Sequence, residues 1–444
     1  MEDEQCQAIL RALGAFDYAA ANKLIVRLAK VYQPIGNILT RLCTCENSFT
    51  QLQFLRSRWF VMRKDTSVEV VYTNLASELP KEILNLHSVS WLSVKDREGL
   101  IVVMDALRKF CLVRREMISS YQSILAQSSK GEFDEVLKEI EAIQERAFEM
   151  NLSSSLSLLG LGVEKEINIL TCLLRARTSI TNYAFQDACI GLYQAKQDLS
   201  EWKRLCQEQS YPEKSSRHED TRETSTWRFT LFGQLESKIN NHKQGDIWPN
   251  TIRWHTRVLA NLTAKMTLYF NRILLEKESI VTEEDPEKSL WKGQRIDYFD
   301  QICTFRKRHG ADSISLIYQV TNNAPFYPQG YICPDTPYEP PQGVHSFPFI
   351  FSHPKEPPTK HLPSIISIIQ GSKYKLDDPK AGPVHFVDSV INSTYYLMRI
   401  DQHVVFVIIY LEKTHSEPAT AEFMNNIVTS LRGTAVIEEL IRVD

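Results

Sequence analysis

The chain has 444 residues, of which 43% are hydrophobic and 24% are charged. This composition is typical of a globular protein and excludes a disordered chain, and the length allows about two to four domains. Lys and Arg total 51 while Asp and Glu total 54, so the net charge of −3 creates no overall attraction to nucleic acid or to an anionic membrane.

The N-terminus and the cysteines predict a cytoplasmic protein. The sequence opens with Met1-Glu2-Asp3-Glu4, which lacks the basic and apolar regions of a signal peptide. The longest apolar run is Val404–Leu411, whereas a membrane-spanning helix needs about 20 residues. The 9 cysteines are scattered and odd in number, which argues against a disulfide framework. We therefore expect free thiols and no membrane-spanning segment.

Proline separates two parts of the chain. Of 19 prolines, 13 lie between Pro325 and Pro383. Because proline breaks helix interiors, the earlier residues are free to form helices. We predict a bundle of long antiparallel helices over 1–280, with a mobile polar loop at about 208–226.

Apolar spacing locates the individual helices of this bundle. Glu132–Met150 carries one apolar stripe at helical spacing, and Ser93 with Asp96 forms a capping signal at the start of the preceding helix. Leu156–Gly162 is expected to be an apolar turn or a frayed helix start. The predicted helices cover about 3–13, 16–32, 35–63, 80–88, 93–127, 132–150, 163–177, 179–208, 227–242 and 249–279.

A linker at 281–286 precedes a second part, which we predict to be a small α+β domain over 287–444 with a proline-rich insertion at about 325–361. Its expected elements, in chain order, are a helix at 287–309, strands at 313–320 and 347–351, a helix at 362–370, strands at 384–391, 394–400 and 403–412, and helices at 418–431 and 434–442. The run Val404–Leu411 is apolar at every position, which predicts a strand buried on both faces in the middle of the sheet. This element order resembles the roadblock and longin domains.

The sequence contains no motif that indicates catalytic, cofactor-binding or metal-binding residues. Neither nucleotide-binding glycine pattern occurs, and Cys43-Thr44-Cys45 lacks the second cysteine pair of a zinc site. His345, His353 and His361 recur in the proline-rich segment, where solvated loop histidines are favoured over a zinc site. Expected cofactors are therefore none.

Interaction with partners is the function that these absences favour. The segment Tyr331–Pro341 is rich in aromatic residues and proline, and such pre-ordered segments make good ligands because little entropy remains to be lost. The alternative is an ordinary loop packed on its own domain. The candidate partner-contact residues are Tyr331, Pro334, Tyr338, Phe347, Phe349, Phe351 and Trp291.

The running sequence resembles the KICSTOR subunit 2 family over essentially the full chain. The likeness extends from Cys6–Leu10 and Phe16–Lys23 to Gly330–Pro334 and Val436–Leu440. No catalytic signature carries it. The resemblance implies a non-enzymatic scaffold of the KICSTOR complex, which recruits the GATOR GTPase-activating subcomplex to the lysosomal membrane surface. It also implies negative regulation of mTOR complex 1 signalling when amino acids or glucose are scarce.

The partners implied by the resemblance are kaptin, an integrin-alpha FG-GAP repeat protein, a very large scaffold subunit, GATOR and, indirectly, Rag GTPases. Two other hypotheses stay open at this point. One is an enzyme whose active site is assembled from dispersed residues, which a deep pocket with convergent titratable groups would favour. The other is a nucleotide-responsive regulator, which calorimetry with GTP and GDP would test.

Overall fold

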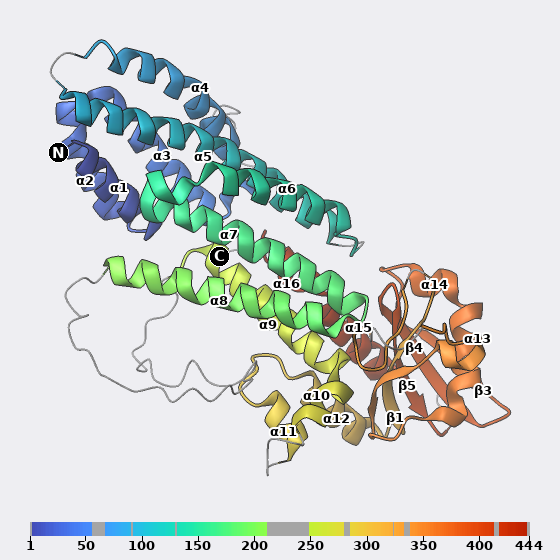
Figure 1. The fold of residues 1–444 in the computed structure, drawn as a ribbon. Coiled ribbons are helices and arrows are strands. Elements are labelled where there is room, and N and C mark those ends of the chain that lie inside the picture. Colours follow the sequence, from blue (N-terminus) through green and yellow to red (C-terminus); the bar gives the residue numbers. More distant parts are fainter. Residues whose placement is uncertain are drawn as a thin grey trace.

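The computed structural model describes residues 2–55, 67–89, 92–128, 131–210, 248–278, 285–322, 324–332, 338–412 and 417–441. Helices form most of the molecule, and a five-stranded antiparallel sheet lies in the C-terminal region. Figure 1 shows the sheet beside one end of the long helices.

The bounds of the elements follow the chain. The helices are α1 (Glu2–Gly14), α2 (Tyr18–Val31), α3 (Gln33–Thr50), α4 (Val68–Leu86), α5 (Val94–Gln127), α6 (Asp134–Met150), α7 (Leu152–Thr181), α8 (Phe185–Ser210), α9 (Asn250–Tyr269), α10 (Asn271–Glu278), α11 (Pro286–Trp291), α12 (Tyr298–His309), α13 (Leu362–Gly371), α14 (Lys373–Asp377), α15 (Pro418–Arg432) and α16 (Thr434–Glu438). The strands are β1 (Ser313–Tyr318), β2 (Phe349–His353), β3 (Val384–Asp388), β4 (Ser393–Asp401) and β5 (Val404–Tyr410).

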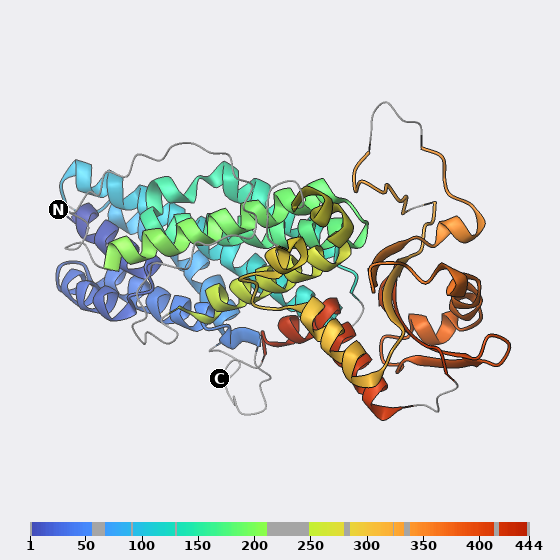
Figure 2. The same cartoon turned by 90° about the horizontal axis from the view of Figure 1, so that it is seen from below.

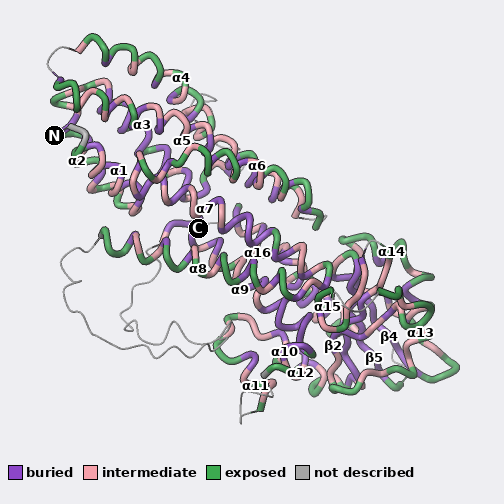
Figure 3. The backbone as a smooth tube through the Cα atoms, viewed as in Figure 1, coloured by how far each residue is buried: buried purple, intermediate pink, exposed green. Residues whose placement is uncertain are grey.

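Helix α7 is the central element of the helical part. It contacts α1, α5, α6, α8 and α9, and both main apolar clusters include its side chains. The first cluster joins α7 to helices α1–α6, and the second joins it to α8, α9 and the sheet. Figure 3 shows the corresponding buried face of α7 toward its neighbours.

The sheet has the strand order β2-β1-β5-β4-β3, so the last strand is central, as predicted. All of Val404–Tyr410 is buried. Successive β5 side chains point to opposite faces. Val404, Phe406, Ile408 and Tyr410 therefore face α9, α12 and α15, while Val405, Val407 and Ile409 face α13. Figure 2 shows α12 and α15 side by side between the long helices and the sheet.

One apolar core includes residues from both sides of the predicted linker. The second cluster contains Trp202 and Phe270 from the helical part together with Ile302 and Phe406 from the C-terminal part. Residues 281–284 of the linker lie outside the described residues, as do 211–226 of the predicted polar loop and the whole predicted helix at 227–242. Helix α8 continues to Ser210, two residues beyond the predicted loop start.

Several predicted helices differ from the observed ones. The helix expected at 80–88 instead starts after Ser67, whose Oγ accepts a hydrogen bond from Val70 N at 3.3 Å, and it continues through Pro80. Burial of Tyr72, Leu75 and Leu79 outweighs the roughly 3 kcal/mol local cost of an interior proline.

Two other predicted helices were wrong in their boundaries because the chain turns within them. The expected helix at 287–309 is two helices separated around Gly293, which has φ +80°. The expected helix at 249–279 is interrupted at Phe270. The expected turn at 156–162 lies within α7, which bends at Ser157. The helix expected at 35–63 ends at Thr50, and its last residues lie outside the described part.

Candidate functional site

The predicted partner-contact residues divide by exposure. Tyr331 and Tyr338 are 39% and 38% exposed, and the Tyr338 ring lies 5.0 Å from that of Tyr327. Pro334 lies outside the described residues. These two tyrosines therefore keep side-chain surface that a partner can reach.

The remaining candidates are buried: Trp291, Phe347, Phe349 and Phe351. Trp291 stacks on Phe299, and Phe351 meets the same ring edge-on. Phe347 and Phe349 pack in the cluster under α13. Their aromatic surface is already used in this chain's own core, and the contact of these four side chains with a partner stays a prediction.

The outer strand of the sheet carries exposed apolar residues that were not predicted to contact a partner. β3 pairs with β4 alone, and Phe386, Val387, Val390 and Ile391 of β3 and the following turn are exposed. Figure 1 places β3 at the end of the molecule farthest from the N-terminus. Edge strands present unpaired backbone groups to solvent, so this edge suits strand addition.

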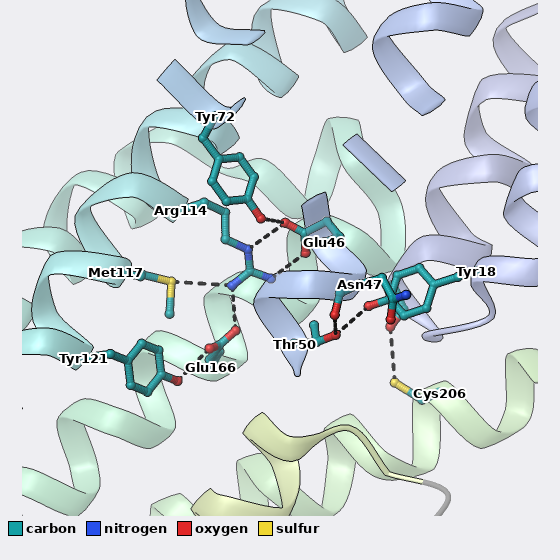
Figure 4. Close-up of polar contacts among 11 residues, drawn as sticks. Tyr18, Glu46, Asn47, Thr50, Tyr72, Arg114, Met117, Tyr121, Glu166 and Cys206 are labelled. Carbon is teal, nitrogen blue, oxygen red and sulfur yellow. Dashed lines mark hydrogen bonds and ion pairs between the residues drawn. The ribbon is translucent and has the colours of Figure 1, made fainter. Parts of the chain in front are cut away.

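A buried ion network lies in the middle of the helical part. The Arg114 guanidinium of α5 donates to Glu46 of α3 at 3.0 and 3.1 Å, and to Glu166 of α7 at 2.6 Å. Tyr72 of α4 donates to Glu46, and Tyr121 of α5 donates to Glu166 at 2.7 Å. Figure 4 shows these side chains converging from four helices.

The charged groups of this network have their partners within the network. Burial opposes the charge of Arg114, but the two carboxylates outweigh burial and raise its pKa. Burial raises the pKa of Glu46 despite Arg114, and burial and the adjacent carboxylates raise the pKa of Tyr72 and Tyr121, which stay neutral donors. Every charged group already has its partner in the chain, so this arrangement fits a structural role.

A second polar site is a cavity of about 710 Å³ where the helical part meets the sheet. Arg177 of α7, Asp401 at the end of β4, Arg399 of β4 and Arg432 of α15 contribute to its wall. Beneath it, Lys265 of α9 pairs with Asp401 at 2.6 Å.

The Asp401 carboxylate accepts polar contacts at the base of this cavity. Tyr269 donates to its Oδ2 at 2.5 Å. Burial opposes ionisation of Asp401, but Lys265 and Tyr269 more than offset it and lower its pKa. Burial lowers the pKa of Lys265 despite the attraction of Asp401. The pair fixes the β4–β5 turn on α9.

Cysteine and histidine positions do not point to metal or thiol chemistry. Within the described residues, no group of three or more side chains of metal-ligating type comes together. Cys43 and Cys45 turn to different carbonyl oxygens, those of Tyr18 and Val68. His361 contacts the Tyr395 hydroxyl at 2.8 Å.

One cysteine and one histidine do approach each other. Cys303 Sγ lies 3.9 Å from His353 Nδ1. Burial raises the pKa of Cys303 to about 11 and lowers that of His353. A reactive cysteine–histidine pair needs the opposite shifts, toward thiolate and imidazolium.

None of the helices in the described ranges combines the length and apolar composition needed to cross a lipid bilayer.

Comparison with known proteins gives consistent matches over nearly the whole chain. The family model described as "KICSTOR complex C12orf66 like" matches residues 21–442. A Xenopus laevis protein named KICSTOR subunit 2 is 25% identical over 454 aligned positions, covering 99% of this chain and 96% of the relative. A Danio rerio protein of the same name is 27% identical over 405 positions, covering 89% and 84%.

The fold and these sites define a predominantly helical protein with a C-terminal antiparallel sheet and with buried ion pairs in its core. The chain belongs to the KICSTOR complex C12orf66-like family.

Proposed function

We propose that this protein is a non-enzymatic scaffold subunit of the KICSTOR complex. The observation that supports the proposal is the extent of the similarity. The family model spans residues 21–442, and two relatives named KICSTOR subunit 2 align with this chain over most of their own length. A scaffold acts through surfaces distributed over its whole length, which agrees with matches that extend over most of the chain.

The same proposal includes the protein's location, its effect on signalling and its partners. The protein acts in the cytoplasm and at the lysosomal surface, where KICSTOR recruits GATOR and restrains mTOR complex 1 signalling under amino acid or glucose deprivation. Its partners are kaptin, the integrin-alpha FG-GAP repeat protein and the very large scaffold subunit, and it reaches Rag GTPases indirectly through GATOR. Exposed Tyr331 and Tyr338 and the apolar β3 edge support docking of proteins.

The C-terminal part is proposed to be roadblock- or longin-like. Support comes from its central last strand and the order β2-β1-β5-β4-β3. The division into 1–280 and 287–444 belongs to this proposal as well. The shared apolar core means that deleting either part would expose buried surface, so point substitutions on the full chain are the better probe of interfaces.

The test is affinity purification of the tagged full-length chain from its own cells, followed by mass spectrometry. The other KICSTOR subunits are expected in stoichiometric amounts. A double variant, Tyr331→Ser with Tyr338→Ser, is expected to lower their recovery, whereas Tyr374→Ser, at a side chain 94% exposed on α14, is the matched control. Recovery of the wild-type chain without any of these subunits would refute the scaffold proposal.

A further inference from the structure

The cavity between the helical part and the sheet holds a buried cation with no ion-pair partner. Arg177 is only 9% exposed. Among the described residues, none places a carboxylate within ion-pair distance of its guanidinium, and no hydrogen bond from that guanidinium is formed; its contact is with the Phe133 ring, 4.4 Å from the centroid. A charge held largely away from bulk water without a partner is unfavourable, and a bound counter-charge removes that cost.

The same wall carries a second guanidinium, which no carboxylate in the described part of the chain contacts. Arg432 donates to the carbonyl oxygens of Arg399 at 2.6 Å and Pro379 at 3.0 Å. Both arginines line this cavity, and Arg177 lies against the residue that follows Arg432, because a Cβ built on Gly433 would lie 3.2 Å from Nη1 of Arg177. Gly433 has φ +73°, so the turn after α15 brings bare backbone against the guanidinium.

Two of the carboxylates that line this cavity already form ion pairs, and two others lie at the start of α6. Asp401 pairs with Lys265, and Asp377 pairs with Arg399 at 2.8 Å. Asp134 and Glu132 are on the wall formed by the start of α6. Asp134 accepts a contact from Thr178 Oγ1 at 3.5 Å. Arg177 and Arg432 therefore keep positive charge that no carboxylate of the described residues pairs, and Asp134 and Glu132 flank the Phe133 ring that Arg177 contacts.

We propose that this cavity binds a small soluble organic polyphosphate, whose phosphate groups bind Arg177 and Arg432 and whose hydroxyl groups donate to the carboxylates at the start of α6. Guanidinium groups bind phosphate through paired, charge-assisted hydrogen bonds. Exposed Lys373 lines the rim and adds a further positive charge. The volume of about 710 Å³ accommodates a molecule of nucleotide or inositol phosphate size.

Isothermal titration calorimetry and thermal melting of the full-length chain test the proposal, with ATP and inositol hexakisphosphate as separate probes. At least one probe is expected to bind and to raise the melting temperature, and the preferred probe distinguishes a nucleotide site from an inositol phosphate site. Failure of both probes at millimolar concentration would overturn the proposal.

Variants separate a ligand site from a structural arginine. Arg177→Met keeps an apolar stem against Phe133 and is expected to weaken binding about 10- to 100-fold, while the ligand-free protein melts at the same or a higher temperature because an unpaired buried charge is removed. Unchanged affinity, or a lower melting temperature of the ligand-free variant, would refute the assignment of Arg177. Arg175→Met is the control on the same helix, since Arg175 pairs with Glu141 at 2.7 Å outside the cavity.

Lys373→Gln gives a second test that does not depend on a buried position. Lys373 is exposed, so its loss leaves the fold intact, and affinity is expected to fall about 3- to 10-fold with a weaker salt dependence. Lys375→Gln, two residues further on and outside the cavity wall, is expected to bind as wild type. Equal affinity of both lysine variants would contradict the proposed site.

Discussion

At the scale of single residues, Arg114 is the group on which the helical core depends most. It forms ion pairs with both Glu46 and Glu166, which are buried with it. Replacing Arg114 with Met leaves two uncompensated carboxylates close together and is expected to lower the free energy of unfolding by about 3–5 kcal/mol. Urea denaturation followed by circular dichroism measures the loss.

Arg115→Met is the matched control for this substitution. Arg115 follows on the same helix and is only half-buried, so the variant is expected to stay within about 0.5 kcal/mol of wild type. Similar losses for both variants would show that helix α5 tolerates neither change and that the network carries no special stabilisation.

His255 makes stability depend on pH. Burial lowers its pKa, Glu166 partly opposes this, and Lys203 adds to it. The unfolded chain binds a proton near pH 6.5 while the folded chain does not, so the stability from neutral His255 is present above pH 6.5 and is lost as pH falls toward the folded pKa. The slope is at most about 1.4 kcal/mol per pH unit for one histidine.

Urea unfolding at pH 7.5 and pH 5.5 tests this. His255→Gln keeps a donor for the Thr251 carbonyl and is expected to lose less stability on acidification than wild type does. His87→Gln, at an exposed position, should follow wild type. Burial also lowers the pKa of His353 and His403, so the His255 variant should retain part of the pH dependence. An identical pH dependence in wild type and His255→Gln would contradict the expectation.

At the scale of elements, the bend in α7 depends on close backbone contacts. A Cβ on Gly14, at the end of α1, would lie 2.4 Å from the Leu158 carbonyl carbon, next to the bend at Ser157. Gly14→Ala is therefore expected to cost about 1–3 kcal/mol of unfolding free energy through this overlap. Gly371→Ala, where a Cβ would meet nothing within 4 Å, should be neutral or slightly stabilising. Chemical denaturation of both variants gives the comparison, and equal stability would refute the steric reason.

At the scale of the whole molecule, the continuous core predicts cooperative unfolding. Lys265→Met removes the partner of Asp401 at the junction and is expected to destabilise the chain by about 3 kcal/mol, since Tyr269 still donates to the carboxylate. Hydrogen exchange should then accelerate in both α9 and β5. Lys288→Met, at an exposed lysine, is the control. Acceleration in α9 with unchanged exchange in β5 would show that the two parts unfold independently.

Much of the secondary structure could be predicted because it is encoded locally. The Ser93 cap, the stripe of Glu132–Met150 and the apolar run of β5 each act over neighbouring residues, and each matches the structure. The helix through Pro80 could not be predicted, because packing against distant helices outweighs the local preference, whereas the bend at Ser157 lies within the turn predicted at 156–162.

The sequence by itself therefore determined the helical first part, the central last strand and, through its resemblance, the family. Only the tertiary structure decided which aromatic residues are exposed, how Arg114 pairs with carboxylates 68 and 52 residues away, and that Arg177 and Arg432 line one cavity. Periodicity records which side of an element is apolar, but it holds no information on which buried charges will meet. That choice depends on how the helices and the sheet pack together.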